Sequence, residues 1–126
     1  TEPSARFGNI FVFRGTFPRP TAMLARGIFY RTIYSTIYTH EPNIPAAIEG
    51  IERSLALDDS CYFVALELGN QYLKLGKREE ALKAYRSSYE KAPRNDGIYN
   101  LIGEQVQRVE LEPLENIAPL RNPGIE

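Results

Sequence analysis

The sequence has very few of the side chains from which most catalytic and metal sites are built. Among its 126 residues there is one histidine, His40, one cysteine, Cys61, and no tryptophan. Neither residue has a second histidine, a second cysteine or an acidic cluster at ligand spacing, so we expect no metal site. Cys61 as a nucleophile would have only His40 as its base, and no glycine-rich phosphate loop occurs. The sequence therefore predicts no catalytic residue and no cofactor, and we expect that the chain is not an enzyme.

The chain also lacks a surplus of charge of either sign and any long apolar run. Its formal net charge is -1, which provides no basic surface for a phosphate backbone, so we expect no nucleic-acid partner. No apolar stretch approaches the length that crosses a bilayer, so we expect no membrane insertion. The lone cysteine leaves the redox compartment, and with it the localisation, open. Because the first residue is Thr1 and not methionine, we expect a processed chain or a fragment of a longer protein.

What the sequence does contain is a helix–turn–helix pattern, which is clearest over residues 62–95. Two runs of apolar and small residues at helical spacing are separated by Gly76, where a left-handed conformation can end the first helix. Pro93 ends the second run, because it lacks the backbone N–H that a continuing helix requires. Small residues inside the runs would allow two helix backbones to approach closely. The runs are defined by Leu68, Gly69, Tyr72, Ala81, Tyr85 and Ser88.

This spacing resembles the tetratricopeptide repeat, a helix–turn–helix unit of 34 residues. The runs LGNQY at 68–72 and ALKAY at 81–85, with the closing Pro93, match the pattern of that family. Ala65 stands where the family prefers tryptophan. The resemblance implies that successive units stack as a right-handed superhelix whose first helices line a concave face.

A step of 34 residues relates this unit to earlier and later parts of the chain. The step back pairs Ala81 with Ala47, Tyr85 with Ile51, Ser88 with Ser54 and Gly69 with Ser35. We therefore expect a helical domain over 21–111, with repeats at about 28–61 and 62–95 and a capping helix at about 96–111. Pro42 replaces the turn glycine of the first repeat, which indicates a tighter or differently routed loop. The predicted fold is all-α: a TPR-like right-handed superhelix of two helix–turn–helix repeats plus a C-terminal capping helix, with an extended or strand-like N-terminal segment.

The first helix is expected to continue as far as Pro42. Tyr30, Tyr34 and Tyr38 recur at every fourth position along it, and we expect this stripe to pack in the core. A ladder of rings that stacks on a ligand is the alternative. The N-caps expected for the first, second and last helices are Thr21, Asn43 and Asp96.

Residues 1–20 do not follow a helical pattern. Asn9 to Phe13 is an aromatic and β-branched run, and Pro18 and Pro20 prevent a helix from starting earlier. We expect an extended segment that packs on the helices. The alternative is a strand that pairs with another chain or with a further domain.

The resemblance implies a peptide-binding surface on the concave face. In related repeats, an asparagine at the place of Asn70 commonly binds the backbone of an extended peptide; the alternative is that Asn70 only bonds a neighbouring helix. Repeats that hold a chaperone's C-terminal carboxylates use a clamp of Lys, Arg and Asn, of which only Asn70 is present, so that subtype is not expected. The residues expected to bind a peptide are Phe29, Thr32, Thr36, Phe63, Leu66, Asn70, Lys74, Asn100 and Glu104.

Two functions remain open on this basis. The first is a protein–protein interaction module that binds a peptide or protein segment on its concave face. The second is a non-catalytic structural or assembly appendage of a larger protein. The run GNIFVFRGTF at 8–17, followed by repeats, resembles the tail of large bacterial membrane glycosyltransferases, and this resemblance transfers no catalytic residue. The N-terminal strand or the apolar helix faces could also pair two copies as a homodimer.

The C-terminal tail, residues 112–126, is too rich in proline to be a helix. Leu114, Ile117 and Leu120 nevertheless recur at every third residue, the repeat of a polyproline-like segment, which puts them on one side. We expect an ordered tail that lies against the capping helix and shields its apolar side chains. The alternatives are that the tail occupies the groove in place of a ligand, or that it is a frayed terminus.

Overall fold

The computed structural model describes residues 19–126, and this part of the chain is all-α, as predicted. It contains five α-helices and one short 3-10 helix. They are α1 (Pro20–Thr36), α2 (Ile44–Leu57), α3 (Tyr62–Lys74), α4 (Arg78–Lys91), α5 (Gly97–Leu111) and η1 (Leu114–Asn116). The strand-like run predicted from Asn9 to Phe13, together with the rest of residues 1–18, lies outside the described residues.

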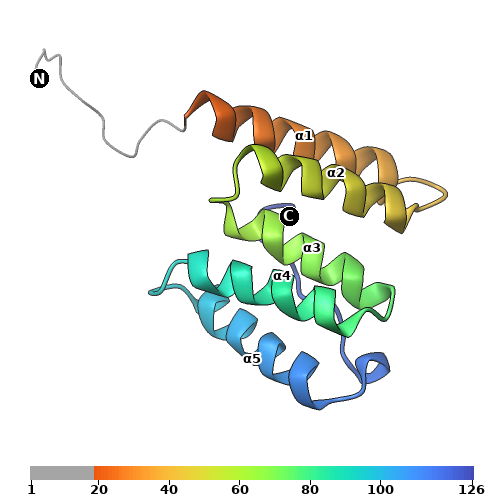
Figure 1. Ribbon diagram of the computed structural model, residues 1–126, viewed down its shortest axis with the longest axis vertical. Coiled ribbons are helices and arrows are strands. Elements are labelled where there is room, and N and C mark those ends of the chain that lie inside the picture. Colours follow the sequence, from red (N-terminus) through yellow and green to blue (C-terminus); the bar gives the residue numbers. More distant parts are fainter. Residues whose placement is uncertain (1–18) are drawn as a thin grey trace, which may run out of the picture.

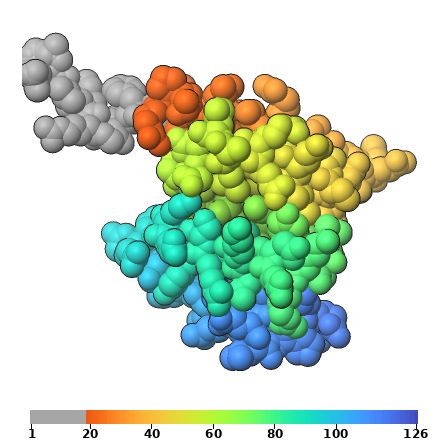
Figure 2. Space-filling view, viewed as in Figure 1, coloured from red at the N-terminus to blue at the C-terminus, as the bar shows by residue number. Residues whose placement is uncertain are grey.

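The helices form two hairpins and a closing helix (Figure 1). α1 packs on α2, and α3 packs on α4; α2 also contacts α3, and α5 contacts α4. The helices therefore follow one another in chain order from one end of the molecule to the other, as the space-filling view also shows (Figure 2). This order agrees with the predicted two pairs followed by a single helix.

Local sequence signals account for several helix boundaries. The side chain of Asn43 accepts a hydrogen bond from the Ala46 N–H at 3.1 Å, and Asp96 accepts one from the Ile98 N–H at 3.3 Å. Both residues are thus N-caps, as predicted. Gly76 has a φ of 75°, in the left-handed region that favours glycine. This conformation turns the chain from α3 into α4 within a short loop.

Glycine allows the two helices of each hairpin to approach closely. A Cβ atom at Gly69 on α3 would lie 2.6 Å from Cδ1 of Tyr85 on α4. A Cβ atom at Gly50 on α2 would lie 2.3 Å from Oγ1 of Thr32 on α1. Gly69 therefore lies at a tight helix–helix contact, as its place among the apolar residues predicted.

Two clusters of buried side chains make up the core. The first joins α1, α2, α3 and, through Ala84, α4, and it includes Phe29, Ile33 and Ile51, which are fully buried. The second joins α3, α4 and α5 and includes Leu66 and Tyr85, also fully buried. Because α3 and α4 contribute to both clusters, the two hairpins and the closing helix share one continuous interior.

The first helix differs from the prediction at both ends. It begins one residue before Thr21, with Arg19 as its N-cap. It ends at Thr36, well before Pro42. The hydroxyl of Thr36 donates to the Thr32 carbonyl at 2.6 Å, and such bonds from side chain to backbone compete with the helical ladder. Ile37 and Thr39, which follow, are β-branched residues of low helix propensity and do not extend the helix towards the proline.

The tyrosine stripe of α1 is not in the core, contrary to the prediction. Tyr34 and Tyr38 are 55% and 58% exposed, and only Tyr30 is half-buried. The reason is that the side of α1 facing α2 carries Ala25 and Phe29. The two exposed tyrosines lie with ring centroids 5.7 Å apart and contact each other more than the interior.

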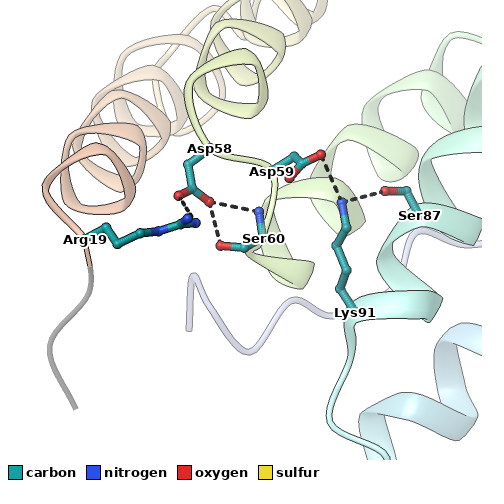
Figure 3. A network of polar contacts seen from close by, with 6 residues as sticks. All are labelled: Arg19, Asp58, Asp59, Ser60, Ser87 and Lys91. Carbon is teal, nitrogen blue, oxygen red and sulfur yellow. Dashed lines mark hydrogen bonds and ion pairs between the residues drawn. The ribbon is translucent and has the colours of Figure 1, made fainter. Parts of the chain in front are cut away.

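The loop that joins the two hairpins is held by polar contacts on both sides (Figure 3). The Asp58 carboxylate accepts hydrogen bonds from Ser60, at 2.9 Å from its N–H and 2.5 Å from its hydroxyl, and from the Arg19 guanidinium at 2.8 Å. The bonds from Ser60, and then the charge of Arg19, hold the pKa of Asp58 below its ordinary value. Asp59 pairs with Lys91 of α4 at 3.6 Å. These contacts tie the loop to α1 and α4.

Candidate functional site

The C-terminal tail is ordered and runs back across one side of α5, α3 and α1. Near its start, Gln105 of α5 donates from Nε2 to the Ala118 carbonyl at 2.9 Å. Near its end, the Tyr30 hydroxyl of α1 donates to the Gly124 carbonyl at 2.6 Å. In Figure 1 the tail passes from the end of α5 behind α4 and α3, and the C-terminus lies near α2. The side chains that contact it form a surface that we call the tail face: Tyr30, Phe63, Glu67, Asn70 and Gln105.

The apolar residues of the tail are turned inward. Ile117 is 6% exposed and belongs to the cluster between α3, α4 and α5, and Leu114 and Leu120 pack against the same cluster. The three-residue stripe thus faces one side, as predicted, and the tail covers α5. The tail is not polyproline-like throughout, however, because Leu114 begins the 3-10 helix η1, which also has three residues per turn. The tail also continues along α3 to α1. Its path follows the first helices of both hairpins, where the sequence analysis placed a bound peptide.

Asn70 makes two hydrogen bonds to the main chain of a single tail residue, Leu120. Its Nδ2 donates to the Leu120 carbonyl at 2.9 Å, and its Oδ1 accepts from the Leu120 N–H at 3.0 Å. Asn70 is 2% exposed, so both bonds are removed from water. Because they reach only backbone atoms, they hold an extended chain without regard to the side chain at position 120.

Tyr85 and Gln105 fix the orientation of the Asn70 amide. The Tyr85 hydroxyl donates to Asn70 Oδ1 at 2.5 Å and accepts from Gln105 Nε2 at 3.3 Å. Burial raises the pKa of Tyr85, so its hydroxyl keeps the proton that it donates. With its oxygen bound to that hydroxyl, the Asn70 amide presents one acceptor and one donor to the tail. Tyr85 of α4 and Gln105 of α5 therefore fix the orientation of the Asn70 amide independently of its bonds to the tail.

Asn122 of the tail occupies a buried polar site on α3. Its Nδ2 donates to Glu67 Oε1 at 3.1 Å and to the Phe63 carbonyl at 2.8 Å, and its Oδ1 accepts from the Gly124 N–H at 3.0 Å. Glu67 is 7% exposed, and its Oε2 accepts from Gln71 Nε2 at 2.6 Å. Over residues 19–126, Glu67 takes part in no ion pair with a lysine or arginine. Side-chain amides supply the hydrogen bonds that a buried carboxylate requires.

The end of the tail passes against two aromatic rings. A Cβ atom at Gly124 would lie 2.3 Å from the ring of Phe63, so this position accommodates glycine and no larger residue without a shift. Tyr30, whose ring centroid lies 6.2 Å from that of Phe63, holds the Gly124 carbonyl. Burial raises the pKa of Tyr30, which favours the protonated, donating hydroxyl.

Some of the residues predicted to bind a peptide do contact or border the tail. Phe63 and Asn70 belong to the tail face. Lys74 is exposed and lines a cleft of about 150 Å³ beside the tail, together with Asn70 and Glu67. Leu66 lies on the same helix but is fully buried in the core beneath. α3 was therefore read in nearly the correct register.

The other predicted residues lie away from the tail. Phe29 and Thr32 are buried on α1, where Thr32 faces Gly50 of α2, and Thr36 is half-buried with its hydroxyl bound to the Thr32 carbonyl. Asn100 and Glu104 are exposed and border a surface hollow that includes Tyr89 of α4. Of these five residues, Phe29 packs against Phe63, with ring centroids 5.8 Å apart, but it is fully buried beneath the tail face. All five were assigned from the 34-residue step and from helical spacing.

The register of α1 explains why Phe29, Thr32 and Thr36 lie away from the tail. Ser88 Oγ of α4 donates to the Tyr62 carbonyl at 2.8 Å, and Ser54 Oγ of α2 donates to the Ala25 carbonyl at 2.7 Å. The two serines are 34 residues apart (88 − 54), but their acceptors are 37 apart (62 − 25). The first helices of the two hairpins are thus offset by three residues from the expected step. The loop over 37–43, longer than that over 75–77, absorbs the difference.

A step of 37 residues locates the residue that the sequence analysis missed on α1. It takes Glu67 back to Tyr30 (67 − 37), and both side chains contact the tail. The equivalent serines at 54 and 88 were visible in the sequence, but their carbonyl partners were not. Gln105 was missed because the tail was expected to cover apolar side chains of the capping helix, and no signal singled out a polar partner there.

The two residues that the sequence analysis considered for catalysis or metal binding are Cys61 and His40. Cys61 is half-buried, and burial raises the pKa of its thiol, which makes it a poor nucleophile at neutral pH. His40 is exposed in the loop after α1. In the part of the chain that the structure describes, no histidines, cysteines and carboxylates gather in a group that could hold a metal ion. None of its helices combines the length and the apolar character needed to cross a membrane.

Comparison with models of protein families, with curated proteins and with solved structures gives no match for this chain. The resemblance to the tetratricopeptide repeat therefore stays a prediction. The candidate site rests on the contacts of the tail face alone.

Proposed function

We propose that this chain is a tetratricopeptide-like interaction module that binds an extended peptide or protein segment on its tail face. The observation that carries this proposal is the pair of hydrogen bonds between the buried Asn70 amide and the main chain of Leu120. A side chain that only supported the helices would have no need to match a donor and an acceptor to one residue of an extended chain. Tyr85 and Gln105 hold the amide ready in that orientation.

Several features of the fold support the resemblance to stacked repeats. In both hairpins a serine of the second helix donates a hydrogen bond to a main-chain carbonyl near the start of the first helix. Both also use a glycine where the paired helices come closest. α1, α3 and α5 all contact the tail, and in the proposed right-handed superhelix these would be the helices that line the concave face. In this proposal α5 caps the second repeat, and the module carries out no chemical step.

A labelled peptide offered to a chain whose own tail cannot dock tests this function. In the full chain, Leu120→Pro removes the N–H that Asn70 accepts, and Asn122→Asp sets a carboxylate against Glu67. This open-face variant leaves every residue of the tail face unchanged. We expect it to bind a fluorescent peptide of residues 112–126, measured by anisotropy, while the unsubstituted chain binds the same peptide more weakly because its own tail is in place.

The contribution of Asn70 is measured against a second asparagine. Asn70→Ala in the open-face variant should weaken peptide binding by about tenfold or more, because two buried main-chain groups lose their partner. Asn100→Ala is the matched control, since Asn100 is exposed on α5 and does not touch the tail. Circular dichroism verifies that each variant keeps its helices. Equal binding by the Asn70 and Asn100 variants would contradict the proposed function.

The second candidate function is a structural appendage of a larger protein, such as the glycosyltransferase-like protein that the sequence resembles. One observation favours it: Ile117 and Asn122 of the tail are only 6% and 4% exposed, as little as core residues. A tail that never undocks would be part of the core, and the tail face would not be available to a partner. Hydrogen exchange of the Leu120 amide separates the two functions. A structural tail exchanges only when the whole chain unfolds, whereas a displaceable tail exchanges faster, by local opening.

A further inference from the structure

We propose that the tail face selects its peptide through a primary amide side chain, which enters the site formed by Glu67 and the Phe63 carbonyl. The ligand is an extended peptide with the pattern Leu-x-Asn-Pro-Gly, which this chain carries in its own tail at 120–124. This inference rests on the proposed function and adds a requirement that backbone recognition by Asn70 does not impose.

Only an amide satisfies all three partners in this site. The two hydrogens of Asn122 Nδ2 meet two acceptors, Glu67 Oε1 and the Phe63 carbonyl. Its Oδ1 accepts from the Gly124 N–H. Aspartate has no hydrogen to donate at neutral pH and would bring a second negative charge to Glu67. Lysine could satisfy the two acceptors, but it has no acceptor for the N–H of Gly124.

Burial makes the requirement strict. Asn122 is 4% exposed and Glu67 is 7% exposed, so water does not replace a missing hydrogen bond in the bound state. Because Glu67 has no cationic partner among the described residues, the entering side chain has to complete its hydrogen bonds. A peptide that lacks the amide therefore leaves Glu67 Oε1 with only the longer hydrogen bond, 3.4 Å, from Asn70 Nδ2.

Glycine two residues after the amide is the second requirement. A Cβ atom at position 124 would overlap the ring of Phe63, at 2.3 Å, while the Gly124 carbonyl accepts from Tyr30 at 2.6 Å. A shift of the peptide backbone away from the Phe63 ring would therefore strain or break the hydrogen bond from Tyr30. In contrast, Arg121, which lies between Leu120 and Asn122, is exposed and pairs with Glu126, so its position is free to vary.

Binding of variant peptides to the open-face variant tests the selectivity. We expect the Asn122→Asp peptide to bind about tenfold or more weakly than the 112–126 peptide, and the Gly124→Ala peptide to be weakened by a similar factor. The Arg121→Ala peptide is the matched control and should bind within about twofold, since its exposed ion pair contributes little. Equal binding by the Asp and Asn peptides, with binding still dependent on Asn70, would overturn the amide requirement and leave the proposed function intact. Binding that does not depend on Asn70 would overturn the proposed function first.

A measurement within the intact chain does not depend on the open-face variant. Asn122→Asp alone should speed hydrogen exchange of the Leu120 amide by about tenfold or more, because the tail undocks from α3. Adding Glu67→Gln should restore much of the protection, since a glutamine amide can donate to the aspartate that replaces Asn122. Glu67→Gln on its own serves as the control for general loosening of α3. Unchanged protection in Asn122→Asp would show that this site does not discriminate between an amide and a carboxylate. No recovery in the double variant would show that Glu67 is not the group that discriminates.

Discussion

Replacement of Gly69 by alanine is the most direct test of how closely α3 and α4 are packed. The added methyl group would lie 2.6 Å from Cδ1, 2.7 Å from Cε1 and 2.9 Å from Cγ of Tyr85. Tyr85 is fully buried, and its hydroxyl is held by Asn70 and Gln105. The ring therefore cannot move aside without breaking these hydrogen bonds or separating the two helices.

The expected change in the free energy of unfolding follows from three effects. Overpacking of a well-filled contact costs about 1–3 kcal/mol. Loss of the hydrogen bonds at the Tyr85 hydroxyl adds about 1 kcal/mol for each bond. Alanine is a better helix former than glycine, which acts in the opposite direction by about 1 kcal/mol. We therefore expect Gly69→Ala to destabilise the protein by about 2–4 kcal/mol.

Urea unfolding followed by far-ultraviolet circular dichroism measures this change. Gly27→Ala is the matched control, because Gly27 lies within α1 and a Cβ atom there would have nothing within 4 Å. We expect the control to stabilise the protein by about 0.5–1 kcal/mol, so the two substitutions have opposite signs. If Gly69→Ala raised the urea midpoint as Gly27→Ala does, the close contact with Tyr85 would not be a real constraint.

Two further substitutions test the tail and the loop between the hairpins. Ile117→Ala should lower the free energy of unfolding by about 2–5 kcal/mol, as for other buried aliphatic side chains. Leu111→Ala, at an 82% exposed position, is the control and should change it by less than about 0.5 kcal/mol. Similar urea midpoints for both variants would show that the tail is not part of the folded structure. The lowered pKa of Asp58 contributes stability that is present above its ordinary value of 3.8 and is lost as the pH falls through the lower folded-state value. Asp58→Asn should therefore reduce stability at neutral pH and flatten the pH dependence of the urea midpoint in the acid range, and an unchanged slope there would contradict the assigned contacts.

The second hairpin and the helix that follows it were predictable because their signals are local. Gly76 in a left-handed conformation, Asp96 as an N-cap and Gly69 at the closest helix contact each depend on a few neighbouring residues. Periodic apolar spacing then identifies the buried side of each helix. Asn70 could be singled out for the same reason, since its place in the helix pattern identifies the side that it faces.

The first hairpin was predicted less well because a fixed step hides a change in loop length. α2 keeps the 34-residue relation to α4, as Ser54 and Ser88 show, but α1 is displaced by three residues relative to α3. A shift of three residues corresponds to a rotation of about 300° around the helix axis, which is about 60° short of a full turn. The side of α1 that carries Tyr30 is then wrongly assigned to Ile33 or Thr32. The loop over 37–43 that accommodates this shift was itself not predicted, because the first helix was expected to continue to Pro42.

The course of the tail could not be predicted in detail for a different reason. The spacing of Leu114, Ile117 and Leu120 indicated an ordered segment with one apolar side. The contacts that place it join residues 50 positions apart, such as Asn70 and Leu120, and have no periodic trace in the sequence. Pairing of a side-chain amide with a distant backbone is visible only in three dimensions.

In the proposed function, the tether between α5 and the tail would set a threshold for any competing peptide. Leu120 follows the end of α5 at Leu111 by nine residues (120 − 111), so the docked segment is never far from its site. Short tethers of this kind give effective concentrations in the millimolar range. A peptide free in solution meets a site that is empty for only a small fraction of the time, and its apparent affinity falls by that fraction. A binder brought to the surface by other contacts has its own high local concentration and overcomes the tail. The module would therefore respond to partners that are already held nearby and ignore the same sequence when it is dilute.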